Sequence, residues 1–271
     1  MTAQPFHGNY HGYYTKRPTE SDARLTLLPK DIFKGKRVLD IGCNEGFVTI
    51  QIAQKYHPQK ILGVDIDDTL IRAAWRKRAA VWSQQGPSVS STVLNAAKES
   101  SNGNRKRKRH AESEPSTPDY SHFPLAFEHM FGPLPVPPSQ NRGKHVFPHN
   151  VAFRTMDFVD GSSPELEEYD VVLAFSITKW IHLNNGDEGL VNFFRRVWDV
   201  LKPGGVFMLE PQGWDGYKKA RRLIKTQHDL ELRPGDFPRV LAEIGFSEVE
   251  HLGVGAANEE GNGILSSRSS S

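Results

Sequence analysis

The stretch 37–53 constrains the fold of this chain more than any other. A short apolar run, 38–41, ends in a turn bounded by Gly42 and Gly46, and the residues after it carry apolar side chains at helical spacing. This order predicts a strand, a tight loop and a helix. The two glycines let the loop backbone come close to a ligand, and the first amides of the helix face the same space.

A second apolar run, 61–64, ends in Asp65. Doubly wound folds place an acid at this point, where it binds the hydroxyl groups of a ribose, so we expect a nucleoside across the ends of the two strands. It is not a dinucleotide, because Asn44 and Phe47 stand where the G-x-G-x-x-G fingerprint requires glycine. An ordinary glycine turn in an α/β domain is the alternative.

The pattern Asp40-x-Gly42-x-x-x-Gly46, followed by Asp65, resembles motifs I and II of class I S-adenosylmethionine-dependent methyltransferases. The resemblance implies a Rossmann-like, mostly parallel, doubly wound α/β sheet and S-adenosyl-L-methionine as the cofactor. This cofactor has no phosphate, so the loop need only approach its amino-acid part and its sugar. Cys43 lies in the same loop, where a small residue is favoured, and we read it as a packing residue rather than a nucleophile.

Composition limits the classes of protein that need to be considered. The chain has 271 residues, 37% of them hydrophobic, which suits one domain. The single cysteine excludes an internal disulfide and a cysteine-cluster zinc site, and we predict no metal. No apolar run is long enough for a membrane span, and residues 1–10 lack the core of a secretion signal, so we expect a soluble intracellular protein with no membrane association.

The chain divides into a leader and one interrupted domain. Residues 1–30 form an aromatic and basic lid segment, and residues 31–271 form the methyltransferase domain. Residues 85–149 are rich in Ser, Pro, Asn and Gly and are expected to be an extruded disordered loop. Its basic run, Arg105 to Arg109, predicts a nuclear import signal or an RNA-contacting tail, with solvated charge as the alternative. Because the net charge is +2 and this run alone is strongly positive, the rest of the chain is net negative. Any RNA affinity of the folded part therefore needs a local basic patch.

The remaining elements follow an α/β order. We expect a helix over 68–82, a third strand over 150–155, a buried fourth strand over 169–176, a helix from about 187 to 201, a fifth strand over 206–210, a basic helix after Trp214, and a closing helix, turn and strand over 241–249. The third strand leads to Asp157 and Phe158, which border the adenine in methyltransferases, although Asp157 could simply cap a turn. The fourth strand delivers Thr178, Lys179 and His182 to the edge of the sheet where α/β ligand sites lie. A structural salt link and a core hydrogen bond are the alternatives for Lys179 and His182.

Four blocks in one order carry a narrower resemblance: Asn9-Tyr10-x-x-Tyr13-Tyr14, the glycine loop, Ser176-x-Thr178-Lys179-Trp180-x-His182-Leu183-Asn184-x-Gly186-Asp187-Glu188-Gly189, and Leu209-Glu210-Pro211-Gln212-x-Trp214. Together they are similar to the bicoid-interacting-protein type of RNA methyltransferase, over about residues 6–250 apart from the loop. The resemblance implies methylation of the 5′-terminal phosphate of a small non-coding RNA in the nucleus. It also implies possible ribonucleoprotein partners, and we expect a monomer.

The resemblance assigns roles position by position. The expected cofactor-binding residues are Tyr14, Arg24, Gly42, Cys43, Asn44, Gly46, Asp65, Ile66, Asp157, Phe158 and Phe175. The expected catalytic residues are Lys179, Tyr13, Thr178 and His182. The expected RNA- and phosphate-binding residues are Arg17, Lys16, Trp180, Trp214, Lys218 and Lys219. For the leader tyrosines, a structural lid packed on the core is the alternative, and for the basic helix a solvated face.

The sequence departs from this family in three places. Asp157-Phe158 stands where relatives often have Asn-Tyr, and Asn185 where they often have Trp. The tail 261–271 lacks an aromatic-rich final strand and predicts a missing or divergent edge of the sheet. Two other functions stay open: a class I methyltransferase acting on a small molecule or protein, and a non-catalytic RNA-binding scaffold.

Overall fold

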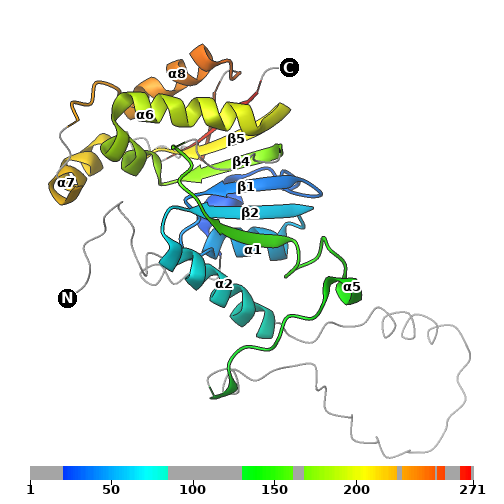
Figure 1. Ribbon diagram of the computed structural model, residues 1–271. Coiled ribbons are helices and arrows are strands. Elements are labelled where there is room, and N and C mark those ends of the chain that lie inside the picture. The colour runs from blue at the N-terminus through cyan, green and yellow to red at the C-terminus, as the bar shows by residue number, and fades with distance from the viewer. Residues whose placement is uncertain are drawn as a thin grey trace, which may run out of the picture. The chain divides into compact units, whose positions relative to one another are not determined.

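The computed structural model describes residues 21–84, 130–160, 168–224, 228–247, 249–253 and 263–269 (Figure 1). Tyr13, Tyr14, Lys16, Arg17 and the basic run at 105–109 lie outside the described residues, so the lid and its alternative stay predictions. The chain separates into two compact units, residues 1–78 with 137–271, and residues 79–136. The larger unit contains the sheet. In the smaller one, the amide of Leu134 donates to Oγ of Ser83 at 2.6 Å.

The sheet has seven strands in the order β3-β2-β1-β4-β5-β7-β6. The strands are β1 (Arg37–Ile41), β2 (Lys60–Asp65), β3 (Val151–Thr155), β4 (Tyr169–Phe175), β5 (Leu201–Glu210), β6 (Glu250–Leu252) and β7 (Ile264–Arg268). The first five run parallel, and β7 is antiparallel to both β5 and β6. The strand order reverses between β1 and β4, and in such sheets ligands bind beyond the carboxyl ends of the strands at this reversal.

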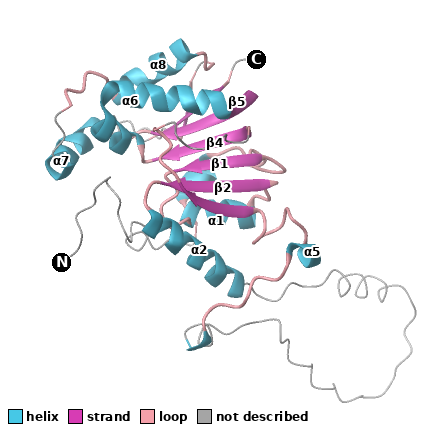
Figure 2. Cartoon of the chain, in the orientation of Figure 1, coloured by secondary structure: helices cyan, strands magenta, loops and turns pink. Residues whose placement is uncertain are grey.

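Helices lie on the sheet and around it (Figure 2). They are η1 (Ala23–Leu27), α1 (Phe47–Lys55), α2 (Asp68–Ser83), α5 (Ser139–Arg142), α6 (Thr178–Val200), α7 (Trp214–Ile224), η2 (Pro234–Asp236) and α8 (Phe237–Ile244). The first part of α2 packs on β3, where Trp75 meets Phe153 edge to face at 5.5 Å. The strands and helices predicted in the larger unit are present, and their order is the one that βαβ units with parallel strands require.

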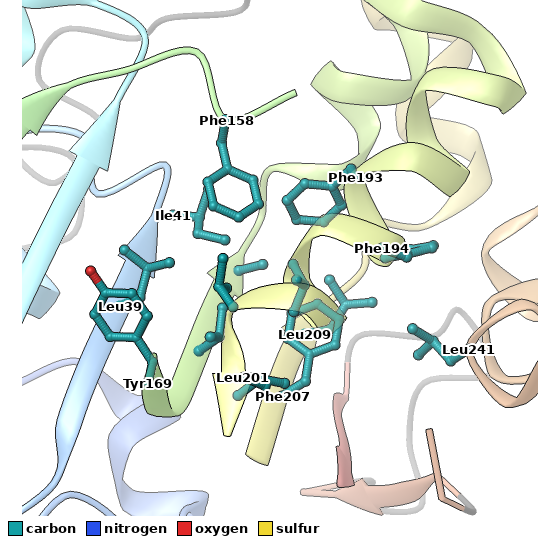
Figure 3. Packing of buried hydrophobic residues seen from close by; sticks show 14 of the residues in the cluster. Leu39, Ile41, Phe158, Tyr169, Phe193, Phe194, Leu201, Phe207, Leu209 and Leu241 are labelled. Carbon is teal, nitrogen blue, oxygen red and sulfur yellow. The ribbon is translucent and has the colours of Figure 1, made fainter. Parts of the chain in front are cut away.

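The largest core lies between the sheet and α6 with α8 (Figure 3). The apolar stripe of α6 supplies Leu190, Phe193, Phe194 and Val197, all with 0% exposure, which confirms that this stripe is core. Phe207 of β5 meets Phe193 and Phe194 at centroid distances of 6.5 and 6.3 Å. Burying several aromatic side chains here supplies much of the hydrophobic free energy that holds α6 on the sheet.

Helix α6 begins nine residues before the expected position near Asp187. It starts at Thr178, and a break at Gly186, with φ 69° and ψ −172°, separates a first part from the part that was predicted. The conformation at Gly186 suits glycine and few other residues. The candidate residues Thr178, Lys179 and His182 therefore lie on a helix.

Two further expectations are wrong. The stretch 85–149 is not disordered throughout, because residues 130–149 are described and Phe147 is buried. Just beyond it, Nδ2 of Asn150 donates to the carbonyl of Ala53 at 3.0 Å. The sheet margin is not missing its last strand either, because β7 lies between β5 and β6.

Among the described residues, no helix combines the length and the apolar character that a membrane span requires.

Candidate functional site

The loop between β1 and α1 is tied to the end of β2. The amides of Gly42 and Cys43 both donate to the carbonyl of Val64, at 2.8 and 3.0 Å. Gly42 has a φ of 74°, and a Cβ added there would lie 2.2 Å from Cγ2 of Ile177, so this position requires glycine on two grounds. The loop therefore runs directly beside the turn that connects β4 to α6. Cys43 is buried, and burial raises the pKa of its thiol, which agrees with a packing role.

Asp65 lies at the carboxyl end of β2 and faces this loop. Its two carboxylate oxygens accept from the amides of Asn44, at 2.9 Å, and Asp67, at 3.0 Å. Each oxygen keeps a further lone pair, so the carboxylate can still accept two hydroxyl groups of a ribose. Burial is the main reason that the pKa of Asp65 is raised. Ile66 follows it, half-buried at the same edge.

Asp40 lies beneath the loop and does not face a ligand. It is 4% exposed and accepts from Oγ1 of Thr49 on α1 at 2.6 Å. Burial raises its pKa to about 6, against the opposing effects of Thr49 and Arg24. Its role is to hold the start of α1 against β1.

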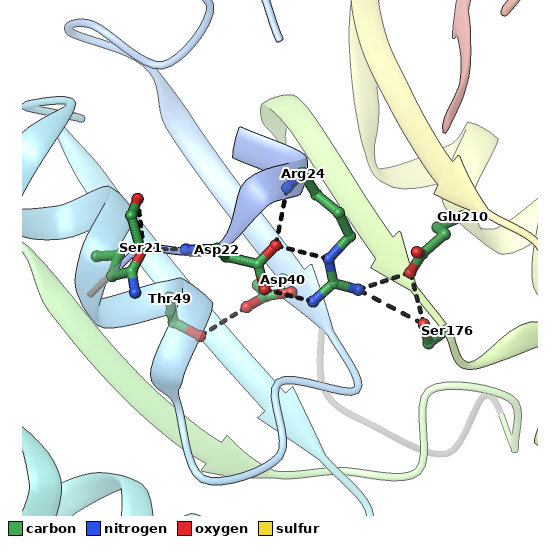
Figure 4. Close-up of polar contacts among 8 residues, drawn as sticks. Ser21, Asp22, Arg24, Asp40, Thr49, Ser176 and Glu210 are labelled. Atoms are coloured by element: carbon green, nitrogen blue, oxygen red, sulfur yellow. Dashed lines mark hydrogen bonds and ion pairs between the residues drawn. The ribbon is translucent and has the colours of Figure 1, made fainter. Parts of the chain in front are cut away.

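Arg24 of η1 reaches the ends of β4 and β5 (Figure 4). Its guanidinium makes ion pairs with Asp22 at 2.7 Å and Glu210 at 2.6 Å. Oγ of Ser176 donates to the same Glu210 oxygen at 2.5 Å. The guanidinium also lies over the ring of Phe175, 4.9 Å from its centroid, and this ring is itself buried. Arg24 was expected to bind the cofactor, and here two carboxylates of the chain hold it.

These residues fit S-adenosyl-L-methionine. Asp65 stands where ribose hydroxyls require an acceptor. Asp22, Arg24 and Glu210 together hold more acid than base, which suits the positive sulfonium and ammonium groups of this cofactor. Gly46, with a φ of 74°, lets the loop close at Phe153 and Ala74 without a side chain in the way.

Asp157 and Phe158 were expected to border the adenine, and in the structure the first caps a turn and the second packs in the core. Oδ1 of Asp157 accepts from the amides of Val159 and Asp160, at 2.9 and 3.3 Å, which is the turn cap that was the alternative. Phe158 is 4% exposed and packs on Phe193 with centroids 5.7 Å apart. Its ring belongs to the core and is not free to pack on an adenine.

Gln212, just after β5, fixes the start of α6. Its Oε1 accepts from the amide of Lys179 at 3.0 Å and from Oγ1 of Thr178 at 3.3 Å. Its Nε2 donates to the carbonyl of Ser176. Gln212 thus caps a helix that has no side-chain cap of its own at Ile177. Thr178 is fully buried in this arrangement, so it holds the helix start and does not reach a substrate.

Lys179 is the half-buried cation of the site. Its Nζ lies over the ring of Trp180, 4.6 Å from the centroid, and 3.5 Å from the position that a Cβ on Gly216 would take. The structure shows no carboxylate paired with it in the part of the chain that is described. Burial lowers its pKa. Lys179 comes two residues after Ile177, whose side chain lies beside Gly42, and its ammonium group extends to the first turn of α7.

His182 is completely buried, so it is not placed to contact a phosphate. Its Nε2 lies 2.5 Å from Oδ1 of Asp187, and its Nδ1 lies 3.3 Å from the hydroxyl of Tyr217. Oδ2 of Asp187 also accepts from the amides of Glu231 and Leu232, at 2.9 and 3.2 Å. Burial lowers the pKa of His182, which favours the neutral ring. The core hydrogen bond that was the alternative for His182 is what the structure shows, and it joins α6 to α7.

The ring of Trp214, at the start of α7, is in contact with two other side chains. Tyr217 stacks on it with centroids 4.7 Å apart, and the Arg233 guanidinium carbon lies 3.9 Å from its centroid. An RNA base would have to compete with these two contacts for the ring, so the expected stacking of Trp214 on RNA stays a prediction. Lys218 and Lys219 are both exposed on α7, and Lys218 is paired with Asp215 at 3.1 Å.

The structure brings the glycine loop, Asp65 and the start of α6 with Lys179 to one edge of the sheet, and four residues that were assigned no role also shape this region. These are Gln212, Glu210, Asp187 and Arg233. Gln212, Glu210 and Asp187 belong to the sequence blocks quoted above, and the place of Glu210 and Gln212 at and just beyond the end of a buried strand was a usable signal. Nothing in the local sequence marked Arg233. No group of three or more His, Cys, Asp or Glu side chains that could hold a metal occurs among the described residues.

The fold is that of known methyltransferases. The chain superposes with a TM-score of 0.50 on the N-methyltransferase NodS from Bradyrhizobium japonicum WM9 in complex with S-adenosyl-L-homocysteine, covering 97% of this chain and 93% of that one at 11% identity. It reaches the same TM-score with an O-methyltransferase family protein from Burkholderia thailandensis, covering 91% of this chain and 55% of the other at 12% identity. The expected class I S-adenosylmethionine-dependent methyltransferase fold is confirmed.

Curated proteins and a family model are also similar to the chain, at higher sequence identity for the curated proteins. A model described as bicoid-interacting protein 3 matches residues 169–265. The 7SK snRNA methylphosphate capping enzyme of Homo sapiens is 38% identical over 260 residues, which is 90% of this chain but 36% of that protein. A probable RNA methyltransferase of Arabidopsis thaliana is 37% identical over 250 residues, covering 90% of this chain and 72% of the relative. The U6 snRNA methylphosphate capping enzyme Amus of Drosophila melanogaster is 34% identical over 259 residues, covering 92% and 69%.

The chain thus spans little more than a third of the length of its mammalian relatives and about 70% of the length of the plant and fly ones. The resemblance drawn from the four sequence blocks is confirmed: the chain belongs to the bicoid-interacting protein 3 family.

Proposed function

We propose that the chain transfers a methyl group from S-adenosyl-L-methionine to an oxygen of the 5′-terminal phosphate of a small non-coding RNA. The relatives named above are RNA methyltransferases and capping enzymes of small nuclear RNAs, and the described cofactor residues fit the methyl donor. The observation that carries the proposal is Lys179.

Lys179 carries a positive charge that no carboxylate among the described residues neutralises. It is half-buried, its pKa is lowered by burial, and the described residues offer it no ion pair. A buried ammonium group without an acid partner is costly, and an incoming phosphate would remove that cost. Because Lys179 follows the turn that touches Gly42, a phosphate on it would stand at the edge of the cofactor crevice.

The chemistry asks little of the protein beyond alignment. When bound, the cofactor supplies a methyl group attached to a positively charged sulfur, and this sulfur is the leaving group and becomes a neutral thioether. The terminal phosphate oxygen is already anionic near neutral pH, so no base has to remove a proton from it. The new oxygen–carbon bond forms as the sulfur–carbon bond breaks. Lys179 would orient the phosphate, while Gln212 would hold the amide of Lys179 and so its position.

The substrate end and the site of action are part of the proposal. The basic run at 105–109 supports entry into the nucleus, and the snRNA-modifying relatives support a small nuclear RNA as the substrate. Tyr13 and Arg17 of the leader are proposed to close over the phosphate, and Lys16 and Trp180 to contact the RNA.

The test is an incubation of the full chain with methyl-labelled S-adenosyl-L-methionine and one RNA sequence bearing a 5′-triphosphate, 5′-monophosphate or 5′-hydroxyl end. Label confined to the phosphate-ended RNAs, and released with the 5′-terminal nucleotide on nuclease digestion, is the expected result. Equal label in the hydroxyl-ended RNA, or none in any, contradicts the proposal.

Lys179→Gln should lower the rate about a hundredfold, the loss typical of one charged group removed from a reacting oxygen. Lys34→Gln is the matched control, because Lys34 is exposed just before β1, at the opposite edge of the sheet. Equal rates for the two variants would show that Lys179 takes no part in the reaction.

A further inference from the structure

Arg233 lies outside every motif considered above, yet its side chain is held in place. Its guanidinium carbon lies over the ring of Trp214, 3.9 Å from the centroid, and Tyr217 stacks on the same side chain with ring centroids 4.7 Å apart. The hydroxyl of Tyr217 is in turn near Nδ1 of His182, in the buried network that joins α6 and α7. An arginine stacked in this way gives up little conformational freedom when its N–H groups bind something.

The charge on Arg233 has no acid partner in the described part of the chain. Arg233 is exposed, and its own backbone amide, rather than its guanidinium, donates to Asp236 at 2.8 Å. Nearby cations differ in this respect: Arg239 is paired with Glu243 at 2.7 Å and Lys218 with Asp215 at 3.1 Å. The stacked guanidinium is thus oriented, charged and available.

Arg233 and Lys179 are carried by one small aromatic cluster. Trp214, under Arg233, and Trp180, under Lys179, both pack against the four buried residues Leu183, Tyr217, Ala220 and Leu230. The Lys179 ammonium lies near Gly216, and Arg233 lies on Trp214, so both cations border the first turn of α7. We name this group of four buried residues and two tryptophans the α7 cluster.

We propose that Arg233 is a second RNA contact: it binds a phosphodiester group of the RNA close to the 5′ phosphate that Lys179 orients. A guanidinium offers two parallel donors to the two free oxygens of a phosphodiester. A phosphate chain also supplies the repeated anions that two separate cations on one rigid cluster need. The inference rests on the proposed function, because it takes the RNA end to lie at Lys179.

The test measures binding of a short 5′-phosphorylated RNA to the full chain between about 50 and 200 mM salt. Arg233→Gln should weaken binding about tenfold and lower the slope of log affinity against log salt by about 0.7, the value for one lost contact to a single strand. Arg233→Lys should keep the slope, because it keeps the charge. Arg239→Gln, an exposed arginine that already has an acid partner, is the control and should change neither quantity.

A second set of RNAs separates contact from structure. Each carries one uncharged methylphosphonate linkage, at the first, second or third position from the 5′ end. If Arg233 binds a phosphodiester, the loss caused by Arg233→Gln disappears with one of these RNAs and persists with the others. An unchanged loss with every RNA, an unchanged slope, or no loss overturns the proposal.

These outcomes are distinguishable from failure of the proposed function. Methyl label is measured separately, so a protein that binds RNA through Arg233 but labels none refutes only the methyl transfer. Label in phosphate-ended RNA with no effect of Arg233→Gln on binding refutes only the second contact.

Discussion

Replacing Asp40 by Asn should raise the free energy of unfolding, relative to that of the unmodified chain, more at neutral pH than in acid. Asp40 is 4% exposed, and burial raises the pKa of its carboxyl from 3.8 to about 6. A carboxyl whose pKa is higher in the folded than in the unfolded state favours folding when protonated. That stability is fully present below the unfolded value and is lost as the pH rises through about 6.

The size of the effect follows from the two pKa values. A shift from 3.8 to about 6, at about 1.4 kcal/mol for each pKa unit, gives about 3 kcal/mol over the full range. Integrated only from about pH 5 to pH 7.5, where unfolding is easily measured, the change is about 1.4 kcal/mol. Asn at this position has no charge to bury, so the free energy of unfolding of the Asp40→Asn variant does not fall with rising pH for this reason.

The assay is urea unfolding of Asp40→Asn and the unmodified chain at several pH values across that range. The quantity compared is the change with pH in the difference between their free energies of unfolding. Any constant cost of the new amide, such as an unpaired N–H beside Thr49, cancels in this comparison. Asp31→Asn, at an exposed aspartate before β1, is the control and should give a constant difference.

A constant difference for Asp40→Asn, or one that falls as the pH rises, would refute the argument. It would mean that Arg24 and Thr49 stabilise the buried carboxylate enough to outweigh desolvation, contrary to the order of causes given above.

Four further predictions concern the other parts of the site. Gln212→Ala removes the acceptor for the amide of Lys179 and should lower the free energy of unfolding in urea by about 1–3 kcal/mol. The variant should also have a lower kcat on RNA and an unchanged affinity for S-adenosyl-L-homocysteine by calorimetry. A weakened cofactor affinity without the other two effects would contradict this prediction. Gly42→Ala places a Cβ 2.2 Å from the β4–α6 turn at a φ of 74°, so calorimetry should show cofactor affinity lost while far-UV circular dichroism stays near that of the unmodified chain. Because burial lowers the pKa of His182, its contribution to stability is present above the unfolded value near 6.5 and is lost as the pH falls, so the unfolding free energy of His182→Gln should decline less in acid. Asp187→Asn should speed amide exchange in α7, and unchanged exchange would show that this carboxylate does not hold α7 on α6.

Much of the fold could be predicted because buried parallel strands appear as unbroken apolar runs. The run 169–176 is an example, since β4 is paired on both sides and buried. The start of α6 could not be predicted in this way. Its first turn has no local cap and depends on Gln212, which is more than 30 residues away in the sequence. Strand β7 was missed because its Ser-Ser-Arg end looks like a tail, and its pairing with β5 and β6 is what buries Ser267.

The candidate site divides in the same way. Asp65 and Lys179 could be placed because the carboxyl ends of parallel strands share an edge, whatever packs around them. The surroundings of His182, Phe158 and Trp214 could not, because each also packs against a residue farther along the chain, namely Tyr217, Phe193 and Arg233. Asp187 follows His182 by five residues in the sequence, whereas Tyr217, which lies near the other ring nitrogen, is 35 residues away.

The end of β5 links the cofactor side of the site to the substrate side. Glu210 binds Arg24 and Ser176, beside the residues that fit the cofactor, while Gln212 caps the helix that carries Lys179. Pro211 lies between them, and a proline holds the residue before it extended, so that residues two apart point to the same side. A change at this tripeptide therefore moves both halves together. Alignment is the main demand of the proposed reaction, since the phosphate oxygen needs no activation, and a short extended segment that positions both reactants meets that demand.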